Sequence, residues 1–401
     1  MKITEMPAFG NLQGLKVVAC HTALAAPYCA SVFAENGAEV ISIENPGKMD
    51  VMKLYGRTFS MEHRNKRSLG LNLKAEGGKK VFSKLIGEAD IFIENSKPGT
   101  WKKLGFSDED LWAIKPDLVI VHISGFGQYG DPAFVPLPAY DMIGQAFSGI
   151  MSMNGVSNEA GPMYLKPYTC DYMSGLIGAW SALAAYINAK RTGTGESIDV
   201  AMYEAAARLQ AGYLCDAVTD GKQPDRIGNG DSLTACDVVY RTSDDKWVIL
   251  AIPIPSPAFI AEIGLGDDPE LRDGGFVGRT DPRAPRYMQA IEDYVASHTR
   301  DEVLAMGAKF GMPSSPVLDY AECKQNPHWE ARETLVQWYD PFTKTDTTGV
   351  GMVPKFKNNP GQIVRGSVGV GVDTDDILEE FGFQPDEIES LRAEGAVTGE
   401  R

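Results

Sequence analysis

The 401-residue sequence contains few histidines and cysteines, and those it has are scattered. Its five His residues form no HxH or HxxxH pair, and its six Cys residues form no CxxC or mixed Cys/His ligand spacing. Structural zinc sites and helix-borne catalytic zinc sites rely on such spacings, so we expect no metal site. Scattered, reduced thiols are typical of a reducing compartment, and we therefore expect a cytoplasmic protein.

Long apolar runs and basic tracts are also missing. The longest apolar stretch extends only from Gly175 to Ile187 and is interrupted by Ser181, which is too short to span a bilayer. Residues 1–16 contain no apolar segment of the secretory type. Because 54 acidic residues outnumber 38 Lys and Arg, the net charge is −16. This charge argues against nucleic-acid and anionic-membrane partners.

What is present is the composition of a globular protein, with short β-rich runs alternating with helical patterns. Apolar residues make up 43% and charged residues 23%. The predicted strands span residues 15–20, 38–44, 89–94 and 118–123, and helices are expected between them. Repeated β-helix-β units of this length predict an α/β fold with a doubly wound parallel sheet. Ligands bind such sheets at the carboxyl ends of the strands, here the loops after Cys20, Glu94 and Ile123.

The second half of the chain no longer shows the alternating strand and helix patterns. Turn-rich sequence begins near Asp220, and residues 238–240 and 247–250 read as a hairpin. We interpret residues 225–325 as a smaller α+β domain. Residues 353–371 are predicted to form a loop, followed by helical patterns over 373–392.

A glycine-rich segment, Gly125–Gly130, formally matches GxGxxG after a strand. A dinucleotide fingerprint must lead directly into a helix, whereas Pro132, Pro136 and Pro138 follow here. The segment is therefore interpreted as a turn or as a flexible loop that lets backbone approach a ligand.

Asp171 precedes a helix rich in small residues, at a position where Asp is a favoured N-cap. A carboxylate there would be kept ionised by the helix dipole and the backbone N–H groups. An ionised carboxylate is also what covalent catalysis on an acyl compound requires. Spacing alone leaves capping and catalysis both open.

Three lysines form a second candidate site. Lys97, Lys102 and Lys103 follow a predicted strand and could hold phosphates or simply begin a solvated helix.

Several motifs occur together in a characteristic order along the chain. They are residues 15–18, 26–27, 37–41, 65–69, 96–99, 124–130 (SGFGQYG), 138–141 (PAYD), 171–175, 195–204 and 354–360 (PKFKNNP). With these motifs the sequence resembles the class III CoA-transferases, the CaiB/BaiF-like family of formyl-CoA, carnitine and bile-acid CoA-transferases, over nearly its whole length.

The resemblance implies that Asp171 is the catalytic nucleophile and forms an aspartyl-CoA thioester. Coenzyme A would be a co-substrate, with no permanently bound cofactor. The resemblance assigns contacts with CoA or a place lining the site to Leu24, Ala25, Leu71, Lys97, Lys103, Tyr140 and Met202. The sequence departs from the family pattern in two places, so the resemblance supports individual phosphate contacts less strongly than it supports Asp171. Asn45 stands where formyl-CoA transferases carry Arg, and their run of glycines in the small domain is absent.

The fold implied by the resemblance is a Rossmann-like large domain with a parallel sheet plus a smaller α+β domain, in an interlocked homodimer. The large domain would comprise residues 1–224 and, after the small domain at 225–325, residues 326–401.

Competing functions stay open on sequence grounds. A racemase of this family would need an acid/base pair, but Tyr140 stands where racemases carry His. Acyl-CoA hydrolysis would need only water in place of the acceptor acid. A non-enzymatic CoA-binding protein, with Asp171 as a helix cap, is the alternative from another class. Motifs such as FGQYG and PKFKNNP favour the carnitine/butyrobetaine or bile-acid branch, for which Tyr28, Tyr129, Tyr140, Phe147, Tyr168 and Tyr172 could surround a quaternary ammonium.

Overall fold

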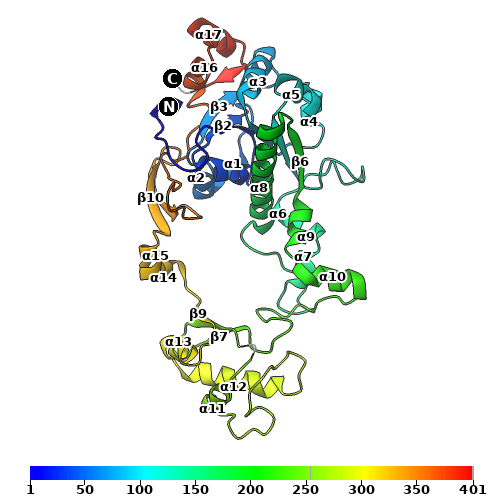
Figure 1. The fold of residues 1–401 in the computed structure, drawn as a ribbon, viewed down its shortest axis with the longest axis vertical. Helices are drawn as coiled ribbons and strands as arrows, with labels where there is room; N and C mark the ends of the chain where they lie inside the picture. The colour runs from blue at the N-terminus through cyan, green and yellow to red at the C-terminus, as the bar shows by residue number, and fades with distance from the viewer. Residues whose placement is uncertain (253, 400–401) are drawn as a thin grey trace. The chain divides into compact units, whose positions relative to one another are not determined.

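The computed structural model describes residues 1–252 and 254–399, which form two compact units (Figure 1). The first unit comprises residues 1–150, 165–210 and 332–401, and the second comprises 151–164 and 211–331. The predicted small domain, 225–325, thus lies inside the second unit. Residues 151–164, 211–224 and 326–331, predicted as part of the large domain, belong to the second unit as well.

Arg226 explains why residues 151–164 belong with the second unit. Its guanidinium donates hydrogen bonds to the backbone carbonyls of Ser152, Ser157 and Asn158. The side-chain amide of Asn158 in turn donates to Asp225 at 2.8 Å. These contacts join segments that are distant in sequence, so a change in local composition could not reveal them.

The first unit is built on a seven-stranded sheet with the order β12-β3-β2-β1-β4-β5-β6. Its strands are β1 (Lys16–Cys20), β2 (Glu39–Glu44), β3 (Arg67–Leu71), β4 (Ile91–Glu94), β5 (Val119–Ser124), β6 (Glu196–Ala201) and β12 (Val397–Thr398). All neighbours are parallel except β12, which pairs antiparallel with β3 at the edge. The predicted α/β fold and parallel sheet are confirmed. Strand order reverses between β1 and β4, the position at which such sheets bind ligands.

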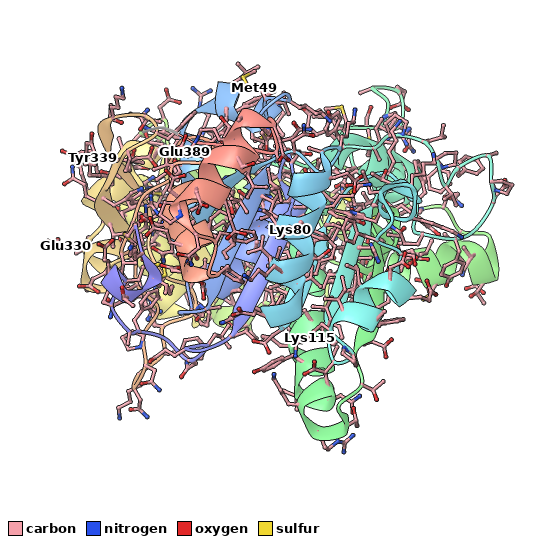
Figure 2. The ribbon with its side chains drawn as sticks, turned by 90° about the horizontal axis from the view of Figure 1, so that it is seen from above. Met49, Lys80, Lys115, Glu330, Tyr339 and Glu389 are labelled. Carbon is pink, nitrogen blue, oxygen red and sulfur yellow. The ribbon has the colours of Figure 1, made fainter. Side chains whose placement is uncertain are left out.

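Helices cover both faces of this sheet. Val17 and Ala19 of β1 face a core shared with α1 (Ala25–Ala34) and α8 (Thr169–Thr192), whereas Val18 faces the opposite core. The opposite core is completed by α3 (Glu76–Glu88), α5 (Asp108–Ile114), α16 (Thr374–Glu380) and α17 (Pro385–Ala393). Figure 2 shows α3, which carries Lys80, beside α17, which carries Glu389. The C-terminal segment therefore completes the first unit's core.

Glycine allows two close helix contacts near the site. A Cβ on Gly175 of α8 would lie 2.5 Å from the Ala25 carbonyl oxygen in α1. A Cβ on Gly144, in α6 (Asp141–Phe147), would lie 2.6 Å from the Cys170 sulfur. Neither position has room for a side chain, so α8 packs directly against α1 and α6.

The second unit contains a three-stranded sheet, β7-β8-β9, whose first two strands form the predicted hairpin. Its strands are β7 (Val238–Arg241), β8 (Trp247–Leu250) and β9 (Ser314–Pro316). Its helices are α10 (Ala211–Asp220), α11 (Pro257–Glu262), α12 (Ala284–Ser297), α13 (Arg300–Lys309), α14 (Tyr320–Gln325) and α15 (Pro327–Ala331). Phe259 and Tyr287 are fully buried in its core.

Several short elements were not predicted from the sequence. They are β3, β12 and the antiparallel pair β10 (Leu335–Asp340) and β11 (Thr345–Val350), together with η1 (Ile3–Glu5), η2 (Val51–Tyr55), α2 (Arg57–Glu62), α4 (Thr100–Leu104), α6 and α7 (Ile150–Met153). Helix α9 (Met202–Arg208) directly follows β6. β3 has no alternating pattern because all five of its residues are buried. Within the described residues, every helix is too short or too polar to cross a membrane.

Candidate active site

A pocket of about 510 Å³ opens at the carboxyl ends of the parallel strands. Its walls come from the ends of β1, β2, β4, β5 and β6 and from the loops that follow them. They include residues 20–25, 43–45, 95–98, 123–125, 137–140, Asp171 and Met202. The pocket thus occupies the place that the strand order predicts, including the three loops identified from the sequence.

Asp171 lies in this pocket in the first turn of α8 and is 7% exposed. It is the third residue of the helix rather than its N-cap, which is Tyr168 in a left-handed conformation. The backbone N–H groups of Cys170 and Asp171 donate instead to Oδ1 of Asp141, at 2.7 and 3.2 Å. Of the two roles left open for Asp171, capping is therefore wrong: Asp141, from α6, caps α8 and leaves the Asp171 carboxyl group available to the pocket.

Asp141 is itself held by Gln145, whose side-chain amide donates to Asp141 Oδ2 at 2.7 Å. The same amide group bonds both the N–H and the carbonyl of Leu165. Both Asp141 and Gln145 are buried. This network fixes the position of the first turn of α8, and hence of Asp171, relative to α6.

Burial raises the pKa of Asp171 to about 7, and the nearby charge of Asp141 adds to the rise. The expectation that the helix end would keep Asp171 ionised is thus also wrong. The physical reason is that the first-turn N–H groups bond Asp141, while Asp171 loses the hydration that stabilises its charged form. A carboxyl group with this pKa changes charge near neutral pH, as functional groups in clefts commonly do.

Five more of the residues implicated by the resemblance line the same pocket. They are Leu24, Ala25, Lys97, Tyr140 and Met202. Asn45, the departure noted in the sequence, lines it too. The structure therefore brings the loop after β1, the loop after β4 and the start of α9 to one place.

Leu71 and Lys103 do not line this pocket. Leu71 is buried in β3, where it pairs with Val397, and its side chain belongs to the core under α3. Lys103 is exposed on α4, and Lys102, rather than Lys103, lines a second hollow that also contains Lys97. Their predicted CoA contacts stay predictions.

The loop that carries Lys97 is held by a buried acid-imidazole cluster. Glu94 accepts hydrogen bonds from Ser96 N–H, Trp101 Nε1 and His122 Nδ1, and His122 Nε2 contacts Asp108 at 3.0 Å. Burial alone would lower the pKa of His122, but its hydrogen bonds with Asp108 and Glu94 outweigh burial and raise the pKa to about 9. An imidazolium clamped between two carboxylates therefore stabilises this loop at neutral pH.

Sequence reasoning missed several pocket residues, among them His21 and Asp50. Asp50 accepts hydrogen bonds from the backbone N–H of Ala23, which has a left-handed φ of 62°. Its side chain thus holds a strained residue next to Leu24. Asp50 follows no strand and matches no motif, so only its tertiary contact reveals this role.

The six aromatic residues considered for an ammonium cage do not gather around the pocket. Tyr140 alone among them lines it within the described residues. Tyr28 and Tyr172 pack edge-on with ring centroids 4.7 Å apart, and the Tyr172 hydroxyl donates to the buried Glu62 at 2.9 Å. The same described residues contain no group of three His, Cys, Asp or Glu side chains that could hold a metal ion.

The fold and site define a parallel α/β protein with a buried carboxyl group at the strand ends. Residues 12–374 match the sequence model of CoA-transferase family III. A bile acid CoA-transferase BaiK of Clostridium scindens is 40% identical, covering 98% of this chain and 91% of its own. An L-carnitine CoA-transferase of a Proteus species is 38% identical, covering 97% of both chains.

Solved structures share the fold. A CAIB/BAIF family protein from Brucella suis matches with a TM-score of 0.80 and 26% identity, covering 93% of this chain and 100% of its own. Rv3272 from Mycobacterium tuberculosis matches with a TM-score of 0.75 at 22% identity, covering 91% and 98%. The chain belongs to CoA-transferase family III and is a CoA-transferase, as the resemblance implied.

Proposed function

We propose that this enzyme moves CoA from an acyl-CoA thioester to a free carboxylic acid through a covalent intermediate on Asp171. The observation that carries the proposal is the position of the Asp171 carboxyl group. It lies in the pocket at the strand ends, and the N–H groups of the first helical turn bond Asp141 instead of Asp171. Burial there excludes much of the water that would hydrolyse activated acyl groups.

The reaction proceeds by two exchanges that balance without a further reactant. An Asp171 carboxylate oxygen attacks the donor thioester carbonyl, and CoA thiolate leaves to give a mixed anhydride. The thiolate then attacks the Asp171 carbonyl carbon, which releases the donor acid and forms aspartyl-CoA. The acceptor carboxylate attacks this thioester and expels the thiolate, which then attacks the acceptor carbonyl of the second anhydride. Asp171 is regenerated as a carboxylate.

The intermediate can be trapped directly. Incubation with an acyl-CoA and no acceptor should leave a peptide containing Asp171 that is heavier by CoA less one water. Hydroxylamine should convert this thioester to a hydroxamate. Intact-protein and peptide mass spectrometry make the measurement. An enzyme that transfers CoA while its Asp171 peptide stays unmodified under rapid quench would contradict the covalent mechanism.

We place the substrates in the carnitine/butyrobetaine or bile-acid branch. Support comes from the relatives named as bile acid and L-carnitine CoA-transferases, both near 40% identity over almost the whole chain. An exchange assay with butyrobetainyl-CoA or cholyl-CoA as donor, and with carnitine and bile acids as acceptors, tests this placement. Free CoA without a new thioester would instead favour acyl-CoA hydrolysis.

We further propose that the chain works as a homodimer, for which α8 provides support. Leu176, Trp180 and Ile187 follow helical spacing on this helix, and they are 46%, 59% and 70% exposed. Exposed apolar side chains in such a row suit contact with a second copy. Sedimentation should show a particle of twice the chain mass, and Trp180→Lys should weaken it. Trp247→Lys, which changes a comparably exposed Trp in the second unit, is the control; a monomeric wild type would contradict the proposal.

We also propose a cytoplasmic location, which the six free cysteines support because four of them are buried thiols without disulfide partners. Cell fractionation tests this location.

A further inference from the structure

Two histidine imidazoles line the same pocket as Asp171 and have no role in the steps above. His21 follows β1, and His63 follows α2. They are 5% and 6% exposed, and their ring centroids lie 5.4 Å apart in an edge-on arrangement. Buried polar groups normally find hydrogen-bond partners within the protein, so the partners of these four ring nitrogens are informative.

His63 has one nitrogen bonded and one open. Its Nδ1 lies 3.0 Å from the backbone carbonyl of Phe59, and its ring stacks on the Phe59 ring with centroids 3.8 Å apart. A carbonyl oxygen can only accept, so Nδ1 must carry a proton. Among the described residues, the hydrogen bond at Nδ1 is the one found for the His63 side chain, and its Nε2, unlike His21 Nδ1, is not among the fully buried unpaired atoms. His21 is similar: its Nε2 contacts Ser42 Oγ at 3.1 Å, whereas its buried Nδ1 has no partner.

The surroundings keep His63 neutral. Burial lowers its pKa well below 6.5, and the positive charges of Lys66 and Lys53 and the neighbouring His21 oppose protonation further. The hydrogen bond to Phe59 favours protonation but is outweighed. With the proton of the neutral ring on Nδ1, Nε2 presents a lone pair and can only accept a hydrogen bond.

The lone pair on His63 Nε2 would interact differently with each polar group of an acid substrate. A carboxylate has no proton to donate and would be repelled by the lone pair, and a quaternary ammonium has no N–H. A hydroxyl group can donate. We propose that His63 Nε2 accepts a hydrogen bond from a hydroxyl group on the acid substrate, so that the enzyme selects hydroxylated carboxylic acids. This inference rests on the proposed function, in which the substrate carboxylate lies toward Asp171.

The test compares pairs of acids that differ by one hydroxyl group. Carnitine is paired with γ-butyrobetaine, and cholate with deoxycholate and with chenodeoxycholate. For each pair, kcat/KM for CoA acceptance is measured in the same enzyme preparation, so the ratio does not depend on the fraction of folded protein. In at least one pair, the wild-type enzyme should prefer the hydroxylated acid by about tenfold, because an acid without the hydroxyl group offers no donor to His63 Nε2.

His63→Phe keeps a ring to stack on Phe59 but removes the acceptor, and the ratio should fall to about one. His298→Phe is a matched control. His298 also stacks on a ring four residues earlier, Tyr294, and contacts the Tyr294 carbonyl through Nδ1 at 2.7 Å, but it lies in the second unit. This variant should retain the wild-type ratio.

Three results would overturn the inference. One is a wild-type ratio near one in every pair. Another is a His63→Phe variant in which kcat/KM falls by the same factor for both acids of a pair. That result would indicate that His63 contacts the pantetheine arm, which all CoA thioesters share. The third is that no acid of either branch accepts CoA, in which case the substrate placement in the proposed function fails and this inference fails with it. A wild-type ratio near one in an enzyme that does transfer CoA to these acids contradicts this inference alone.

Discussion

Asp171→Asn should reduce CoA transfer by at least about 10⁴-fold while leaving the fold intact. An amide oxygen is a poor nucleophile, and loss of a covalent nucleophile typically costs this much or more. Because Asp141 rather than Asp171 accepts the first-turn N–H groups, the substitution removes no helix cap. Initial rates and the mass of the Asp171 peptide, both measured with an acyl-CoA donor, provide the test.

Asp141→Asn is the matched comparison, because it changes a second buried carboxyl group beside the same helix. Its amide oxygen can still accept the Cys170 and Asp171 N–H groups, but its NH2 group would face the Gln145 amide donor, so activity should fall far less than in Asp171→Asn without staying at the wild-type level. The covalent proposal would be wrong if Asp171→Asn kept wild-type rates.

Asp171→Asn should also make the protein more stable at and above pH 7. Burial raises the pKa of Asp171 to about 7, so the folded state holds this proton over a range in which the unfolded state, with a pKa of 3.8, has lost it. Stability therefore falls as pH rises from 3.8 to about 7, and the full penalty applies above that. Because one pKa unit corresponds to about 1.4 kcal/mol, the expected gain is on the order of 2–4 kcal/mol.

Urea denaturation of the wild type and the variant at several pH values between 5 and 9 makes the measurement. The two curves should converge toward acidic pH and separate as pH rises. The single-turnover rate of the wild type should increase about tenfold per pH unit below 7 and level off above it, because the carboxylate is the nucleophile. Equal stabilities at pH 8, or a flat rate profile, would show that Asp171 is ionised throughout this range.

Local sequence was sufficient for the framework of the first unit. The β-rich runs at residues 15–20, 38–44, 89–94 and 118–123 appear as parallel strands. This succeeds because buried parallel strands are nearly continuous apolar runs. The strand-end loops followed from that framework, since parallel strands present their carboxyl ends at one edge. The family, and with it the CoA-transferase activity, came from motifs spread along the chain.

Other features depended on contacts between residues far apart in the sequence. The assignment of residues 151–164 to the second unit depends on Arg226, and β3 is covered by an edge strand, β12, that comes from the other end of the chain. Neither produces a local pattern. Residue preferences at helix ends suggested Asp171 as a cap, because they depend on local sequence alone. The acceptor of the first-turn N–H groups is Asp141, which lies thirty residues earlier in the chain.

The sequence by itself therefore determined the α/β class, the strand-end location of the site and the family, because periodicity and motif order are local or additive along the chain. The tertiary structure decided the chemical state of the site. Whether a carboxyl group or an imidazole is charged depends on burial and on neighbours brought together by folding, as with Asp171 beside Asp141 and His63 beside Lys66.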